Sequence, residues 1–189
     1  MPIKSIHFEE HEIALIQNAE LILAKKNAIE KISELFHSFA FELELDKKIK
    51  SRLNKFDYKI SKGEAYKNLP YLVLDFPKIQ TKKFDILCRT MFWWGNYFSF
   101  NFFVKTDLID FKKISKSNSD AFILMDNDIW NQVVNSDSFK QIDSLNEKDF
   151  ANLSTNEYLK ISKKHPLKEY KSLNKVGLQF YQNIFELLI

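Results

Sequence analysis

The chain has 189 residues, of which 45% are hydrophobic and 28% charged, as in an ordinary soluble globular domain. Its 28 Lys and Arg against 25 Asp and Glu give a net charge of +3, and Lys outnumbers Arg by 26 to 2. Phosphate-binding proteins usually use Arg for bidentate contacts, so this small excess of Lys does not by itself indicate a nucleic-acid partner. A single cysteine, Cys88, excludes an intramolecular disulfide and a thiolate metal cage.

Membrane and export signals are the next class of pattern to consider. Nowhere do eighteen apolar residues run together, as a membrane-spanning helix requires. The first fifteen residues lack the basic segment and apolar core of a secretory signal. We therefore expect one domain, residues 1–189, that works in the cytoplasm without a membrane.

Two helices are predicted in the first third of the chain. Residues 9–24 carry apolar side chains at helical spacing, with acidic residues in the first turn. A second helix is expected from Asn27, a suitable N-cap, with apolar residues three and four apart as far as Leu43 and onward toward Leu53. Together they predict a helical hairpin that buries one face.

Strands are predicted in the middle of the chain. PYLVLDFP (70–77) is rich in strand formers and bounded by prolines. RTMFWWGNYFSFNFFV (89–104) follows, with eight aromatic residues and a Gly95–Asn96 pair that tolerates the positive φ of a hairpin turn. We predict strands at 86–93 and 97–105.

Alternation along these strands separates two faces of the predicted sheet. One face of the second strand is apolar and suits the core: Phe98, Phe100, Phe102 and Val104. The other face is mixed: Tyr97, Ser99, Asn101, Phe103 and Lys105, with Arg89, Met91 and Trp93 from the first strand. Helices covering only the apolar face would produce this pattern.

The rest of the chain completes the predicted fold. Residues 120–126 indicate a further strand, and Asp128 can cap a short helix over 129–134. The C-terminal third is interpreted as helical, with an apolar stripe at Leu173, Val176, Phe180, Ile184 and Leu187. The predicted fold class is α+β: a small antiparallel sheet of three to five strands, with the N-terminal helical hairpin and the C-terminal helices packed on it.

The mixed face is the leading candidate for a binding surface. Arg89 is one of only two arginines, and it shares this face with Trp93, Tyr97 and Asn101. Arginine beside aromatic rings is typical of anion sites and of protein interfaces. The alternative is structural, with the two adjacent tryptophans on opposite sides of the sheet and both buried under other elements.

Carboxylates at strand ends raise a catalytic alternative. Asp75, Asp126 and Asp128 end predicted strands, where acids and bases often lie. An enzyme would need Asp75, Glu64, Lys62 and Arg89 to converge in a cleft. Asp is also a common turn former, and the sequence contains no nucleophile motif, P-loop or dinucleotide fingerprint.

Two weaker patterns concern nucleic acids and metals. Residues 47–83 carry a net charge of +8, against −5 for residues 1–46, and the basic residues of 47–67 are interleaved with Phe56, Tyr58 and Tyr66. Such interleaving can hold single-stranded nucleic acid, or the segment can complement the acidic N-terminal helices. His7 and His11 could share a metal with Glu10, His37 or His165, but exposed terminal histidines are commoner. We predict no metal and no cofactor.

Two segments, KISKGEAYKNLPYLVLDFP (59–77) and RTMFWWGNYFSF (89–100), resemble segments of a group of uncharacterised bacterial proteins. The resemblance lies within residues 59–104 and implies no activity or ligand. It draws attention to a set of polar and aromatic residues: Lys62, Glu64, Tyr66, Lys67, Asp75, Arg89, Trp93 and Asn96.

The leading hypothesis is a binding or interaction protein that recognises a small molecule or a protein through the mixed face. Enzyme activity and nucleic-acid binding through 47–67 are the alternatives. The predicted ligand-binding residues are Arg89, Trp93, Tyr97, Asn101, Tyr66, Lys62, Glu64 and Asp75.

Overall fold

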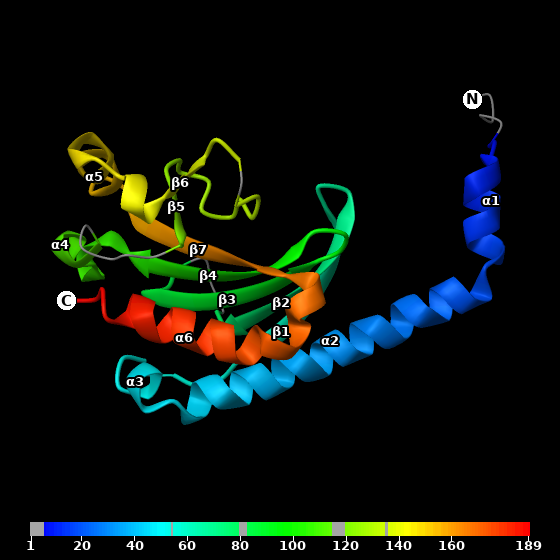
Figure 1. Ribbon diagram of the computed structural model, residues 1–189, viewed down its shortest axis with the longest axis horizontal. Coiled ribbons are helices and arrows are strands. Elements are labelled where there is room, and N and C mark those ends of the chain that lie inside the picture. The colour runs from blue at the N-terminus through cyan, green and yellow to red at the C-terminus, as the bar shows by residue number, and fades with distance from the viewer. Residues whose placement is uncertain (1–5, 54, 80–82, 115–119, 135) are drawn as a thin grey trace.

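The computed structural model describes residues 6–53, 55–79, 83–114, 120–134 and 136–189 (Figure 1). In this part of the chain one antiparallel sheet of seven strands has the order β1-β2-β3-β4-β7-β5-β6. The strands are β1 (Lys59–Tyr66), β2 (Leu69–Phe76), β3 (Ile86–Trp93), β4 (Tyr97–Lys105), β5 (Phe122–Leu124), β6 (Phe139–Gln141) and β7 (Tyr158–Pro166).

Helices lie before, between and after the strands. The α-helices are α1 (Glu10–Gln17), α2 (Ala19–Leu45), α3 (Lys47–Lys50), α4 (Phe111–Ile114), α5 (Glu147–Leu153) and α6 (Leu173–Phe185). Three short 3-10 helices are η1 (Thr106–Leu108), η2 (Ile142–Ser144) and η3 (Leu167–Ser172). None of the described helices combines the length and the apolar composition needed to cross a bilayer.

The main core lies between one face of the sheet and two helices, α2 and α6, which run beneath it in Figure 1. The aromatic face predicted for β4 supplies this core. Phe100 packs edge-on against Phe39 of α2, with ring centroids 6.0 Å apart, and stacks on Phe180 of α6 at the same distance. A Cβ atom on Gly177 would lie 2.4 Å from the Phe100 ring, so this glycine allows α6 to approach the sheet closely.

The second face of the sheet is covered by a segment without helix or strand. Residues 125–138 connect β5 to β6 and, apart from residue 135, which is not described, form what we call the cover segment. In Figure 1 this segment arches over the sheet on the side opposite α6, and the turns of the β1–β2 and β3–β4 hairpins curl toward the same side. A smaller apolar cluster around Val73, Met91 and Trp93 lies on this face.

The α+β class and the central strands are confirmed. β3 and β4 have the predicted bounds, and β2 is shifted by one residue from the predicted 70–77. Gly95 has the positive φ, +70°, expected of the hairpin turn. Phe98, Phe100 and Phe102 are buried under the helices, as the alternation predicted.

The predicted sheet of three to five strands is wrong, because the sheet has seven. The largest omission is β7, which lies in the C-terminal third that we interpreted as helical. Its residues alternate between the core, with Leu159 and Ile161, and the opposite face, with Lys160 and Ser162. The three lysines of β7, Lys160, Lys163 and Lys164, disguise the strand, because lysine is depleted in strands.

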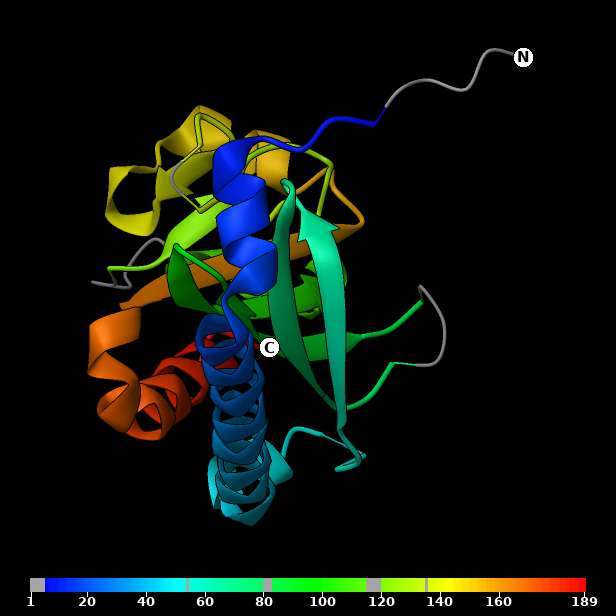
Figure 2. The ribbon, with the colours of Figure 1, turned by 90° about the vertical axis from the view of Figure 1, so that its right-hand side faces the viewer.

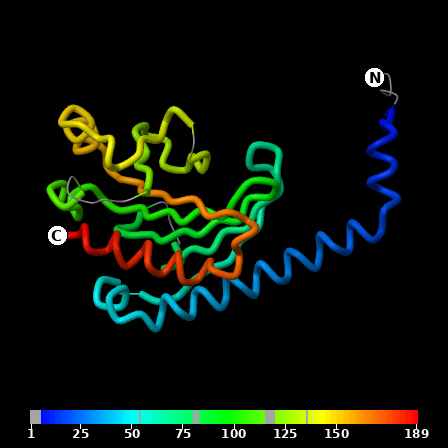
Figure 3. Tube along the Cα trace, viewed as in Figure 1, coloured from blue at the N-terminus to red at the C-terminus, as the bar shows by residue number. Residues whose placement is uncertain are grey.

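The predicted helical hairpin is also wrong. Asn27 lies inside α2, a single helix of 27 residues, and the true N-cap is Asn18, whose side-chain oxygen accepts a hydrogen bond of 2.9 Å from the Leu21 N–H. Figure 3 shows α2 as one continuous helix, with a bend where it meets α1. The helix predicted over 129–134 is absent, because Asp128 accepts from the Trp130 N–H within a turn of the cover segment.

Candidate functional site

A buried ion pair lies at the centre of the covered face. β2 and β3 place Asp75 directly opposite Arg89, and the guanidinium donates two hydrogen bonds to the carboxylate, at 2.6 and 2.8 Å. Only 8% of the Asp75 side chain and 16% of the Arg89 side chain are exposed. The ring of Trp130, from the cover segment, lies 4.9 Å from the guanidinium carbon. The positive charge of Arg89 is therefore matched by one carboxylate and one aromatic face.

A small hydrogen-bonded network extends from this pair across β4 to β7. The side chain of Asn101 is fully buried, and its Nδ2 donates to the Arg89 carbonyl oxygen at 3.2 Å and to Ser99 Oγ at 3.0 Å. Its Oδ1 accepts from Ser162 Oγ at 2.8 Å. Asn101 thus connects three strands, and its side-chain oxygen and nitrogen both have partners.

The most unusual group on this face is Lys160 of β7. Its side chain is 1% exposed, and its Nζ donates to the backbone oxygen of Asn131 in the cover segment. Nζ also lies 4.9 Å from the ring centroid of Phe103 and 5.6 Å from that of Phe139. No ion pair in the described part of the chain includes Lys160.

The pKa of Lys160 reflects this environment. Burial, which removes water from the ammonium group, lowers the pKa well below its ordinary value of 10.5, and the nearby charge of Arg89 lowers it further. Two carboxylates of the cover segment, Asp128 and Asp126, act in the opposite direction. Burial is the largest of these influences, so the net effect of the environment is to favour the neutral amine.

Two tyrosines hold the cover segment on the sheet. Tyr66 of β1 accepts a hydrogen bond of 2.7 Å from the Gln132 N–H. Tyr97 of β4 donates to the Gln132 carbonyl oxygen and accepts from the Val134 N–H, both at 3.1 Å. Burial raises the pKa of both phenols above the ordinary value of 10.0, so the protonated form that makes these bonds persists to higher pH than in a free tyrosine.

Trp93 lies between the two tyrosines, with centroid distances of 5.3 Å to Tyr66 and 5.8 Å to Tyr97. Its Nε1 is buried and has no hydrogen-bond partner within the described part of the chain, and the same is true of Oε1 of Gln132. Buried polar atoms without partners are uncommon in native proteins and are often found where a ligand or water binds. Trp93 belongs to the covered face of the sheet, and Gln132 belongs to the cover segment.

Six of the eight predicted ligand-binding residues lie on this covered face: Asp75, Arg89, Trp93, Tyr97, Asn101 and Tyr66. The other two do not. Lys62 lies opposite Leu72, whose side chain faces the main core, so Lys62 is on the core side of the sheet. The Glu64 carboxylate lies 4.0 Å from the Lys25 ammonium of α2. The catalytic constellation of Asp75, Glu64, Lys62 and Arg89 is therefore divided between two faces of the sheet.

The sequence predictions also missed residues that belong to this face. Lys160 and Ser162 were overlooked because 158–166 was interpreted as helical, although its apolar residues alternate at Leu159 and Ile161. Trp130 and Gln132 were assigned to a short helix. We also expected the mixed face to be open, whereas the cover segment lies on it and leaves Trp93 only 6% exposed.

Other residues of interest have ordinary structural roles. Lys67 lies at the β1–β2 turn with φ of +50°, and Asn96 donates a hydrogen bond to the Trp94 carbonyl oxygen at 2.8 Å. His37 hydrogen-bonds to Tyr58 at 2.8 Å, and buried His165 to the Glu169 carbonyl at 2.8 Å. Across the described ranges, no three His, Cys, Asp or Glu side chains gather as metal ligands would.

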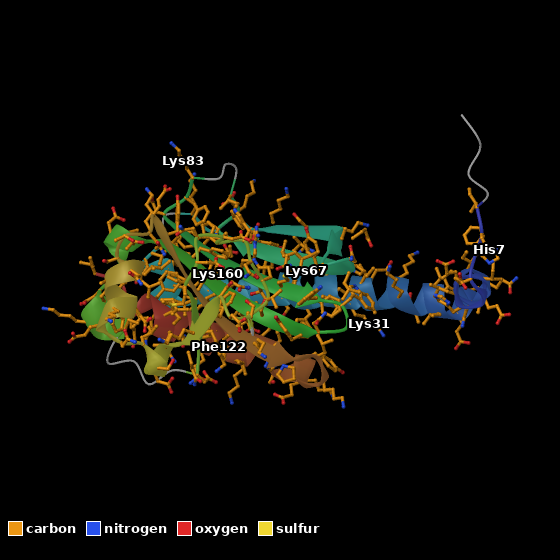
Figure 4. The ribbon with its side chains drawn as sticks, turned by 90° about the horizontal axis from the view of Figure 1, so that it is seen from above. His7, Lys31, Lys67, Lys83, Phe122 and Lys160 are labelled. Carbon is orange, nitrogen blue, oxygen red and sulfur yellow. The ribbon has the colours of Figure 1, made fainter. Side chains whose placement is uncertain are left out.

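A second region of interest is a basic pocket of about 450 Å³ at the end of the sheet where β2 ends and β3 begins. Part of its wall is apolar, formed by Leu53, Pro77, Ile79, Phe84 and Ile86. Its charged groups are five bases and two acids: Arg52, Lys55, Lys78, Lys83, Lys105, Asp57 and Asp85. Lys83 projects from the molecule in Figure 4. Two of these bases are paired within the pocket, Lys78 with Asp57 at 3.3 Å and Lys105 with Asp85 at 2.6 Å, and the bases still outnumber the acids.

The rings of the segment 47–67 are engaged within the protein. Lys50 Nζ lies 5.5 Å from the centroid of the Phe56 ring, Tyr58 contacts His37, and Tyr66 faces the cover segment. Single-stranded nucleic acid binds through bases stacked on accessible rings. This arrangement does not favour the nucleic-acid hypothesis.

Comparisons with protein-family models, curated proteins and solved structures found no match for this chain. Function is therefore inferred from the chemistry of the covered face and of the basic pocket.

Proposed function

We propose that the protein is a cytoplasmic binding protein that holds a small anionic molecule between the sheet and the cover segment. The observation that carries this proposal is Lys160, a buried amine with no carboxylate partner among the residues that the structure describes. Burying such a group without a counter-charge destabilises the folded chain, and natural proteins keep costly polar groups mainly at functional sites.

The balance of charge on this face supports an anion as the ligand. Arg89 is neutralised by Asp75, so an incoming carboxylate or phosphate would find its partner in Lys160. Asp126 and Asp128 of the cover segment favour the charged form of that amine from a distance. A ligand anion bound directly would do so more strongly, because ion pairs with hydrogen bonds are the stronger electrostatic contacts.

The apolar part of the ligand can be inferred from the rings. Trp93, Trp130, Phe103 and Phe139 surround the polar groups of the covered face. Sites of this composition bind molecules with a flat or apolar body and use a few polar groups to fix their orientation. We infer a carboxylate or phosphate monoester attached to an aromatic or aliphatic group.

Entry of such a ligand requires the cover segment to move. The hydrogen-bonding contacts that hold it to the sheet are those of Tyr66, Tyr97 and Lys160, each to the segment's backbone. The segment has no helix or strand of its own, so its local unfolding breaks few backbone hydrogen bonds. A ligand that pairs with Lys160 would replace the contact to Asn131.

A panel of aromatic and aliphatic carboxylates and phosphate monoesters tests the proposal, with binding followed by thermal shift and calorimetry. Lys160→Met should weaken binding of any hit by about tenfold or more, because the amine is lost while the chain length is kept. Lys163→Met is the matched control. Lys163 lies on the opposite face of the same strand and pairs with Asp120 at 2.7 Å, so its loss should leave binding unchanged.

Hydrogen exchange provides a second measurement. A bound anion should slow or accelerate exchange in the cover segment and leave α6 unchanged, since only the segment must open. If no member of the panel binds the wild-type protein, or if Lys160→Met binds a hit as tightly as Lys163→Met does, the proposed site is wrong.

A further inference from the structure

The N-terminal arm, residues 6–24, is the largest feature that the covered face does not explain. It comprises the chain before α1, α1 itself and the beginning of α2, and it projects well beyond the sheet (Figures 1 and 4). No residue of α1 is buried. Eight large apolar side chains of the arm are between 39% and 84% exposed: Ile6, Phe8, Ile13, Leu15, Ile16, Leu21, Ile22 and Leu23.

The sequence nevertheless specifies a helix here. The side chain of Glu12 accepts a hydrogen bond of 2.8 Å from the Glu9 N–H at the start of α1, and Asn18 caps the start of α2. A helix of eight residues is marginal by itself in water, and helices in proteins gain most of their stability by packing an apolar face. The exposed stripe of the arm therefore indicates a partner that covers it.

The charge of the arm restricts what that partner can be. Residues 6–24 contain four glutamates and no Lys or Arg. Helices that lie on membranes are typically rich in Lys and Arg, because the lipid surfaces that they bind are anionic. The arm would be repelled by such a surface, so a protein surface with apolar and basic groups is the better complement.

The basic pocket has that composition. Leu53, Pro77 and Ile86 form apolar walls, and Lys55 and Lys78 are among its five bases. Its volume of about 450 Å³ lies within the range of pockets that hold drug-sized ligands, which are larger than one aliphatic side chain. Acidic and aliphatic groups of α1 thus match basic and apolar groups of the pocket.

The arm cannot reach the pocket of its own chain. α1 precedes α2, whereas Arg52 and Leu53 of the pocket follow α3, at the other end of α2. A continuous helix of 27 residues is about 40 Å long, at 1.5 Å per residue. The eight residues of α1 span about 12 Å and cannot fold back over that distance. Figure 2 views the molecule from the end that carries the arm, with α1 toward the viewer, and Figure 1 shows the arm extending away from the sheet.

We propose that α1 of one copy docks into the basic pocket of a second copy. Each copy then has one donor arm and one acceptor pocket at opposite ends, so the contact is head-to-tail rather than symmetric. Such contacts form either a closed ring or an extending chain, depending on the rotation between copies. This inference does not depend on the covered face or on its ligand.

The state of association of the 189-residue protein in solution is the first test of the proposal. Sedimentation velocity between about 1 and 100 µM should show assembly that increases with concentration, as expected for a small interface. Raising NaCl from about 50 to 500 mM should weaken it, because the rim of the pocket and the arm are exposed and their charges are screened. A monomer under all these conditions would overturn the proposal.

Two variants separate the donor from the acceptor. Ile13→Gln/Ile16→Gln keeps helix-forming residues but removes two apolar contacts of the arm, and Lys55→Glu/Lys78→Glu reverses charge in the pocket. Each should reduce association by about tenfold or more. Their matched controls are Phe41→Gln/Leu45→Gln, an exposed apolar pair on α2, and Lys148→Glu/Lys168→Glu, two exposed lysines elsewhere. The controls should assemble as wild type.

Mixing the two variants is the decisive experiment. The pocket variant still has an intact arm, and the arm variant still has an intact pocket, so the mixture should form one heterodimer that cannot extend. An arm-to-arm or other symmetric contact would not be restored in this way. Absence of a 1:1 complex between two variants whose thermal melts show them folded would overturn the proposal.

Discussion

Replacing Arg89 by Met should destabilise the protein by about 3–5 kcal/mol, because it leaves Asp75 as a buried carboxylate without a partner. The magnitude follows from the geometry of the pair. Two hydrogen bonds of 2.6 and 2.8 Å join side chains that are only 16% and 8% exposed, so water cannot take the place of the guanidinium. Native domains have a total stability of about 5–15 kcal/mol, so this loss is a large share.

The double variant Asp75→Leu/Arg89→Met tests whether Arg89→Met loses stability because Asp75 is left as an unpaired charge or because position 89 tolerates no change. Replacing both partners by apolar residues is often neutral or stabilising, because neither charge then needs to be dehydrated. Part of the contact of Arg89 with Trp130 is lost, which costs about 0.5–2 kcal/mol. We expect the double variant to recover at least about 2 kcal/mol relative to Arg89→Met.

Urea unfolding followed by far-ultraviolet circular dichroism measures all four members of this cycle. The pair Lys105 and Asp85, at 2.6 Å but with side-chain exposures of 37% and 71%, is the control and should show no measurable coupling because solvent screens it. A coupling energy below about 0.5 kcal/mol for Asp75 and Arg89 would refute the reasoning, since independent sites add within that margin.

Two further predictions concern single side chains. Lys160→Met should raise the free energy of unfolding at neutral pH by about 1–3 kcal/mol. Between the lowered pKa of Lys160 and 10.5, the folded chain binds fewer protons than the unfolded chain, so the stability of the wild-type protein should rise with pH across that window. Urea titrations at several pH values should show this rise for the wild type and not for the variant. Gly177→Ala would normally stabilise a helix, but its Cβ would lie 2.4 Å from the Phe100 ring and 2.5 Å from Phe39, so we expect a loss of about 1–3 kcal/mol and a lower Tm. A Tm at or above that of wild type would show that α6 can shift to make room.

The central strands were predictable because local and long-range preferences agree there. Residues 86–93 and 97–105 combine strand-forming residues, strict alternation and a Gly95 turn. The same agreement placed Arg89 and Asn101 on one face, since the register of the β3–β4 hairpin pairs them. Asp75 was predicted only as a carboxylate at a strand end, and its position opposite Arg89 comes from the pairing of β2 with β3 in the structure.

The errors occurred where burial is decided by distant elements. Asn18 and Asn27 are equally good caps by type, and only the continuity of α2 distinguishes them. The lysines of β7 are polar in sequence, yet Lys160 is buried by a segment that lies about thirty residues earlier. The arm has the same apolar spacing as a core helix, so its exposure could not be inferred from periodicity.

The connection between β5 and β6 could change in length and sequence while its two ends stay in the sheet. Phe122 pairs with Gln141 and Leu124 with Phe139, so the two ends of the cover segment are fastened together at the sheet. Loops closed in this way tolerate changes of length and sequence at small entropic cost. A library randomised between these anchor points should still yield proteins that melt as one cooperative unit.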